Sequence, residues 1–143
     1  DEEFKPAVAD ILLHAKECFQ HLGVKEKYVP EMTGIWGMIN PPGSRNKVHT
    51  HPFNYLSGVL YLKVPHKSGN IVFLEPKPQA EVLSPPKNDH MVISLAHSVS
   101  WEPKENSLIF FPSWLQHEVE KNNSKEDRVI LSFNINWRDN ADN

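Results

Sequence analysis

The 143-residue chain lacks several features that would place it in a special class of protein. It has one cysteine, Cys18, so it can form no internal disulfide, and a cytoplasmic location is expected. No apolar run approaches the roughly 18 residues that span a bilayer, which argues against a membrane partner. The net charge of −3 gives no reason to expect nucleic acid as a partner. We therefore expect a single globular domain over residues 1–143.

Acidic residues are missing from a long central stretch. No Asp or Glu lies between Glu31 and Glu75, yet this stretch holds two histidines one residue apart, His49 and His51. Side chains at positions i and i+2 of a strand point to the same face, so two imidazoles at this spacing can bind one metal ion. The pair alone is weak support for a metal site, because two surface histidines would look the same.

What the chain does contain is one amphipathic helix followed by many short strands. Apolar residues recur at helical spacing through residues 4–22, and Gly23 follows as a stop. Short β-rich runs then alternate with turn clusters, which hold most of the 12 prolines; one such run, MVISLA, covers residues 91–96. This spacing predicts an antiparallel sandwich, a jelly roll or a small barrel.

Two residues in the second half of the chain extend the candidate site. His117 follows a tight turn at Pro112, and Arg128 opens the last long strand. Iron in oxygen-activating sites is often bound on one triangular face by two histidines and a carboxylate, which leaves three positions open. Alternation along the last strand, however, puts Arg128 on the polar face, and that pattern by itself predicts a solvated arginine.

Three segments carry a resemblance to a known family: GVLYL, GNIVFLEP and SLIFFPSWLQHEVEKNNSKEDRVILSFN. Together they resemble the 2-oxoglutarate- and Fe(II)-dependent oxygenases, most of all small bacterial and phage proteins with an H-x-H motif that are related to prolyl hydroxylases. The resemblance covers residues 34–137. It implies an all-β core, a cupin-like jelly roll known as the double-stranded β-helix, with the N-terminal helix packed outside. The polar face of the last strand would then line the cavity, which reverses the expectation from alternation.

The resemblance also implies a metal site. His49 matches the first metal ligand of the family and His117 the distal one. His51 stands where most of the superfamily has Asp or Glu, so the implied Fe(II) site has three histidines. Imidazole is a good iron ligand, and three of them leave the same open face.

A cosubstrate site is implied as well. Arg128 matches the basic residue that binds the far carboxylate of 2-oxoglutarate, a task that suits its planar fork of donors. Tyr61 matches a tyrosine that helps to hold the same carboxylate. Asn40 lies near another position that contacts the cosubstrate, and Asn134 should point toward the metal end of the cavity.

The expected function is that of a 2-oxoglutarate-dependent dioxygenase, which uses O2 to hydroxylate an unidentified substrate. That substrate is a peptide, with a peptidyl proline as the first to consider, or a small molecule; a homodimer stays open. One alternative is a cupin-type metalloenzyme that does not use 2-oxoglutarate. The other is a non-catalytic jelly-roll module, which predicts no metal and a solvent-exposed Arg128. The four tryptophans are expected to be core or interface aromatics, with Trp114 as the best candidate for a substrate contact.

Overall fold

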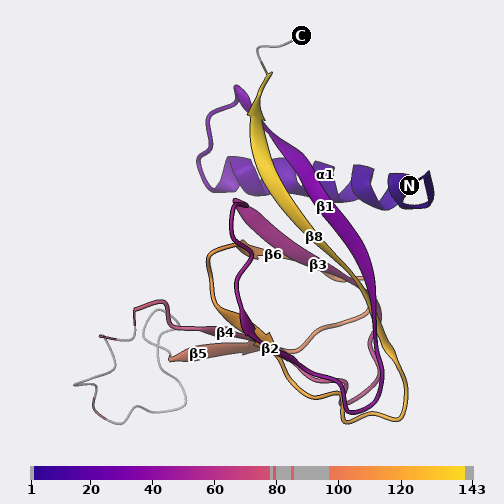
Figure 1. Ribbon diagram of the computed structural model, residues 1–143. Coiled ribbons are helices and arrows are strands. Elements are labelled where there is room, and N and C mark those ends of the chain that lie inside the picture. The colour runs from indigo at the N-terminus through magenta and orange to yellow at the C-terminus, as the bar shows by residue number, and fades with distance from the viewer. Residues whose placement is uncertain (1, 78, 80–84, 86–96, 141–143) are drawn as a thin grey trace.

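The N-terminal segment forms a helix that lies across one sheet (Figure 1). A 3-10 turn, η1 (Glu2–Phe4), leads into α1 (Lys5–His21), and Pro6 stands in the first turn, where its missing N–H costs no helical bond. Gly23, at a φ of 73°, ends the helix, and the backbone N–H of Val24 donates to the carbonyl of Phe19. The observed helix is one residue shorter at each end than the sequence predicted.

The computed structural model describes residues 2–77, 79, 85 and 97–140. The predicted strand at 91–96 lies outside this range. The eight described strands are β1 (Tyr28–Asn40), β2 (Asn46–His49), β3 (Leu56–Lys63), β4 (Ile71–Leu74), β5 (Ser98–Trp101), β6 (Leu108–Pro112), β7 (His117–Val119) and β8 (Arg128–Asp139). No described helix is both long and apolar enough to cross a membrane.

These strands form two antiparallel four-stranded sheets. The first has the order β1-β8-β3-β6 and the second the order β2-β7-β4-β5. Strands far apart in the sequence are thus neighbours, as β1 and β8 are along their whole length. This is the arrangement expected of a double-stranded β-helix with the N-terminal helix outside, and the predicted fold class is confirmed.

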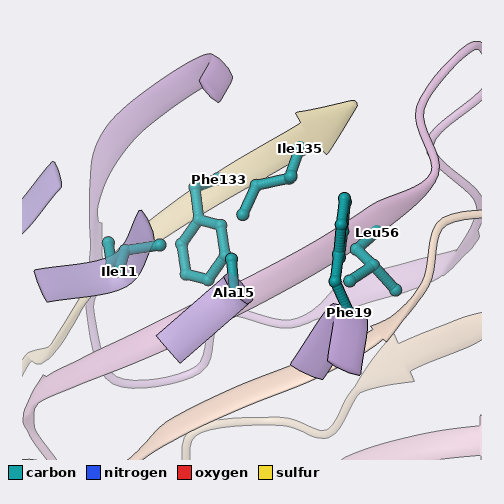
Figure 2. Close-up of a cluster of buried hydrophobic side chains, with 6 residues drawn as sticks. All are labelled: Ile11, Ala15, Phe19, Leu56, Phe133 and Ile135. Atoms are coloured by element: carbon teal, nitrogen blue, oxygen red, sulfur yellow. The ribbon is translucent and has the colours of Figure 1, made fainter. Parts of the chain in front are cut away.

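The outer face of the first sheet packs on α1 (Figure 2). Leu56 of β3 and Phe133 and Ile135 of β8 face the helix, and all three are at most 3% exposed. The cluster is completed from the helix by Ile11, Ala15 and Phe19. Burial of this apolar surface is the main force that fixes α1 on the sheet.

The inner face of the same sheet holds a second cluster and the polar side chains of β8. Its buried apolar members are Val59, Tyr61, Ile71, Phe111 and Ile130. Arg128, on this inner face, is only 1% exposed. The solvated arginine that alternation predicted is therefore wrong, because β8 is covered on both faces: by α1 outside and by the second sheet inside.

Candidate metal centre and cosubstrate pocket

Three imidazoles converge at one end of the space between the sheets. His49 ends β2 and pairs in register with His117, which begins β7; His51 follows two residues after the end of β2. The ring centroids of His49 and His117 are 4.3 Å apart, and that of His51 lies 5.1 and 5.2 Å from them. One nitrogen from each ring lies within 4.8 Å of the others, and together they form a group that could hold a metal ion.

Two backbone carbonyls set which ring nitrogen is available. The Nδ1 atom of His49 lies 2.6 Å from the carbonyl oxygen of Lys47, and the Nδ1 atom of His117 lies 2.9 Å from that of Leu115. A carbonyl can only accept a hydrogen bond, so both Nδ1 atoms must carry the proton. Each Nε2 atom is then left with a free lone pair, which is the arrangement usual for metal-binding histidines.

An apolar surround disfavours the charged form of two of these imidazoles, those of His117 and His51. The rings of Phe111 and Phe73 lie 4.6 and 6.1 Å from that of His117, between centroids. Burial lowers the pKa of His117 to about 4, although the Leu115 carbonyl opposes the shift. Burial, with the neighbouring His49, also lowers the pKa of His51. Neutral imidazoles with free lone pairs fit a first-row transition metal such as Fe(II), whereas Mg2+ and Ca2+ prefer oxygen ligands.

The other end of the cavity is built around a buried arginine. One terminal nitrogen of Arg128, Nη1, donates to the carbonyl of Ser68 at 2.8 Å, and Nη2 donates to Oδ1 of Asn40 at 3.3 Å. Among the described residues its Nε has no hydrogen-bond partner, and no carboxylate pairs with the guanidinium. A buried charge without an anion is costly, so this environment fits a carboxylate ligand.

Tyr61 lies beside this guanidinium and is 3% exposed. Burial raises the pKa of Tyr61 to about 12, with the positive charge of Arg128 acting in the opposite direction. The phenol therefore keeps its proton at neutral pH and remains a hydrogen-bond donor. It is suited to donate to the same carboxylate that Arg128 would bind.

A single cavity of about 570 Å³ joins the two ends. Its walls come from both sheets: Trp36, Met38, Arg45, Asn46, Lys47, Val48, His49, His51, Gly58, Val59, Tyr61, Ile71, Phe111, His117, Val119, Arg128, Ile130 and Ser132. The structure thus brings the three histidines, Arg128 and Tyr61 to one space. Asn40 lies behind the wall and holds Arg128.

Asn134 takes a different place from the other predicted site residues. It is not among the residues that line the cavity, and its Oδ1 accepts a hydrogen bond of 2.8 Å from the hydroxyl of Ser57. That hydroxyl also lies 2.7 Å from the hydroxyl of Ser113, which is fully buried. The carbonyl of Ser113 in turn accepts from the backbone N–H of His51 at 2.9 Å. Asn134 is therefore tied to the backbone of His51, and a direct cosubstrate contact stays a prediction.

Sequence reasoning missed several residues around the site. The Ser57–Ser113 pair gave no signal, because serines 56 positions apart carry no pattern that links them. Trp36 lines the cavity with 36% of its surface exposed, and Trp114 and Trp137 are 62% and 53% exposed. These three tryptophans are therefore not core residues, and the other half of the expectation, an interface position, stays a prediction, as does a substrate contact by Trp114. Two other histidines are not among the residues described at this site: His66 lies in a turn outside it, and His90 lies outside the described residues.

Comparisons with known proteins show the family and the fold of this chain. Residues 34–134 match a family described as "Putative 2OG-Fe(II) oxygenase". No curated protein sequence matches the chain. Among solved structures, a Pseudomonas putida prolyl-4-hydroxylase is 23% identical, with a TM-score of 0.51 over 73% of this chain and 51% of that one.

Two further structures share the fold. An oxidoreductase of the 2OG-Fe(II) oxygenase family from Burkholderia pseudomallei is 13% identical, with a TM-score of 0.61, and the match covers 79% of this chain and 48% of that one. HygX from Streptomyces hygroscopicus, solved with iron bound, is 11% identical, with a TM-score of 0.53 over 94% of this chain and 76% of that one. The chain thus spans about half the length of the first two. The match over residues 34–134 nevertheless covers most of this chain, which belongs to the 2OG-Fe(II) oxygenase family, for which Fe(II), 2-oxoglutarate and O2 are the implied cofactors.

Proposed function

We propose that the protein is a 2-oxoglutarate- and Fe(II)-dependent dioxygenase that hydroxylates a C–H bond of its substrate. The observation that carries this proposal is that three converging imidazoles and a buried, carboxylate-free guanidinium share one cavity. Fe(II), 2-oxoglutarate and O2 would together supply the oxidising chemistry, in which one oxygen atom enters the substrate and the other enters succinate as CO2 is released.

The residues of the chain have three tasks in this proposal. His49, His51 and His117 would hold the metal through nitrogen atoms and leave the opposite face open to ligands. Arg128 and Tyr61 would fix the far carboxylate of 2-oxoglutarate and so orient the cosubstrate. The apolar side chains between the two ends exclude water and strengthen the electrostatic interactions inside.

A non-catalytic role is the weaker alternative. That alternative predicted a solvent-exposed Arg128, which is instead 1% exposed and lies on the wall of the cavity with the histidines. A buried guanidinium without a carboxylate partner costs stability, and such a cost is usual at binding sites. A cupin-type enzyme that does not use 2-oxoglutarate would share the histidines, and Arg128 would then contact an acidic substrate or nothing.

A peptidyl proline is the substrate that we propose first. The support is the structural similarity to the Pseudomonas putida enzyme, whose name states prolyl-4-hydroxylation, and the partly exposed indole of Trp36 at the cavity wall. Aromatic rings are good surfaces for a proline ring, because both are apolar and rigid. We place the enzyme in a reducing compartment, the cytoplasm, on the ground of its one free thiol, Cys18. Nucleic acid and membranes are not among the proposed partners.

The test is whether 2-oxoglutarate is bound and consumed through these residues. Protein prepared without oxygen should form succinate from 2-oxoglutarate only when both Fe(II) and O2 are added. The variant His117→Ala should form none, whereas Lys16→Gln, on the exposed side of α1, should behave as wild type. If the protein binds metal at full stoichiometry but does not bind 2-oxoglutarate, the proposed function is wrong and the cupin-type alternative is favoured.

A further inference from the structure

The wall that β2 and the residue before it contribute to the cavity is cationic. Arg45 and Lys47 precede His49, and both line the same cavity as the histidines. The carbonyl of Lys47 is the group that accepts the hydrogen bond from His49, so this basic residue belongs to the backbone that orients a candidate metal ligand. Among the described residues, neither side chain has an ion-pair or hydrogen-bond partner.

No acid balances these charges within the cavity. None of the residues that line it is Asp or Glu. Two acids elsewhere in the chain have other partners: the carboxylate of Glu120 accepts from the backbone N–H of Asn70 at 3.0 Å, and that of Glu126 pairs with Lys63 at 2.7 Å. The protein as a whole has a net charge of −3, so the cavity has the opposite sign to the molecule around it.

The proposed cofactors do not neutralise all of this positive charge. Three neutral histidines would leave both charges of a divalent metal uncompensated by the protein, and Arg128 adds a third positive charge. The two carboxylates of 2-oxoglutarate would be taken by the metal and by Arg128. Arg45 and Lys47 would then still lack an anion. Clefts of one sign with low-dielectric walls focus the field and concentrate ligands of the opposite sign.

The cavity also has room for a second ligand. Its volume of about 570 Å³ lies within the range of sites that bind drug-sized molecules, roughly 300–1,000 Å³. A small diacid such as 2-oxoglutarate does not fill such a space. Trp36 lines the cavity from β1, so a ligand there has an apolar surface as well as the cationic one.

We infer that Arg45 and Lys47 form a second anion site beside the candidate metal centre, which binds a carboxylate of the substrate. The inference rests on the proposed function and makes it narrower, since the substrate is then an acidic one. For a prolyl substrate, the acid is a Glu or Asp beside the proline or the carboxylate of proline itself. Arg and Lys both suit this task, Arg through its fork and Lys as a point charge.

Binding of matched compounds tests the inference without catalysis. The protein is loaded with Mn(II) and 2-oxoglutarate without oxygen, and tryptophan fluorescence or calorimetry is followed during titration. The probes are acetyl-Glu-Pro-amide against acetyl-Gln-Pro-amide, acetyl-Pro-Glu-amide against acetyl-Pro-Gln-amide, and N-acetylproline against N-acetylprolinamide. At least one acidic member should bind about tenfold more tightly than its neutral match, the sum expected of two partly exposed ion pairs.

In the charge-neutral variant Arg45→Gln/Lys47→Gln, the affinities for the two members of each probe pair should differ by no more than about twofold. Added salt should reduce the difference in affinity that the wild type shows. The control Lys16→Gln/Lys125→Gln removes the same net charge at exposed positions outside the cavity. This control should retain the wild-type difference in affinity between acidic and neutral probes. Equal binding of acidic and neutral members, binding of no member, or a preference that survives in the Arg45→Gln/Lys47→Gln variant would overturn the anion site. So would a loss of 2-oxoglutarate affinity alone in that variant. Failure of wild-type protein to bind 2-oxoglutarate, measured first, would instead reject the proposed function.

Discussion

Single side chains decide which ligands the cavity can accept, and His51 is the candidate ligand that stands where the family resemblance leads us to expect Asp or Glu. Its ring completes the cluster of imidazoles, and its backbone is held by the buried Ser113. We expect His51→Ala to open a coordination position and to weaken Mn(II) or Fe(II) binding by more than about 100-fold, since loss of an outer partner alone typically costs 10–100-fold. His51→Asp recreates the commoner set of ligands and should retain the metal.

Equilibrium dialysis with Mn(II) measures this directly. The matched control is His66→Ala, which removes an exposed histidine from a turn outside the metal cavity and should leave the affinity unchanged. If His51→Ala binds metal as wild type does, His51 is not a ligand, and the three-histidine site is wrong.

Arg128 is the second decisive residue. Arg128→Leu removes the guanidinium and leaves the oxygen atoms of Ser68 and Asn40 without their donor. Loss of one member of a desolvated charge pair costs roughly 2–5 kcal/mol, so the affinity for 2-oxoglutarate should fall by more than tenfold while the metal still binds. Arg128→Lys should retain part of the affinity, because it keeps the charge but not the two parallel bonds.

Calorimetric titration of 2-oxoglutarate into the Mn(II)-loaded protein separates these cases. Arg138→Leu serves as the control, because Arg138 is an exposed arginine at the other end of the same strand, β8. Unchanged affinity in both Arg128 variants would mean that the guanidinium does not bind the cosubstrate.

At the scale of elements, β8 shows what the sequence could and could not predict. Helical periodicity predicted α1 within one residue at each end, because period and stop signals are local. Alternation separated the two faces of β8 correctly but could not say which layer covers each, so Arg128 was assigned to solvent by pattern and to the cavity only by family resemblance. The convergence of the histidines depends on the pairing of His49 with His117, 68 positions apart, which no local pattern encodes.

The packing of β8 on α1 gives a prediction about stability. Phe133 is 1% exposed, and its ring lies against Gly58, where a Cβ atom would collide with it, and 5.4 Å from that of Phe110. Phe133→Ala should lower the free energy of unfolding by about 3–5 kcal/mol, the usual cost of such a cavity. Urea denaturation measures the change. Leu13→Ala, at a helix position that is 59% exposed, should cost less than about 0.5 kcal/mol, and similar losses in both variants would contradict this account of the core.

On the scale of the whole molecule, the cavity lies between the two sheets and takes polar side chains from both. The histidines come from β2, β7 and the segment after β2, whereas Arg128 and Tyr61 come from β8 and β3. A metal with 2-oxoglutarate bound to both groups would join the two sheets through ligand bonds. Binding to the folded state alone must then raise its stability by mass action.

Thermal unfolding therefore reports on both ends of the cavity at once. Mn(II) at about 100 times its dissociation constant should stabilise the protein by about 2.7 kcal/mol, which is roughly 10 °C in Tm for a domain of this size. Addition of 2-oxoglutarate should raise the Tm of the wild type further. In Arg128→Leu, 2-oxoglutarate should raise the Tm less, because it can then bind only at the metal end of the cavity. In His117→Ala, neither Mn(II) nor 2-oxoglutarate should raise the Tm. Mg2+ serves as the control, since it prefers oxygen ligands and should leave the Tm unchanged. A Tm that Mn(II) does not move, or that moves equally in His117→Ala, would mean that the metal does not bind between the imidazoles.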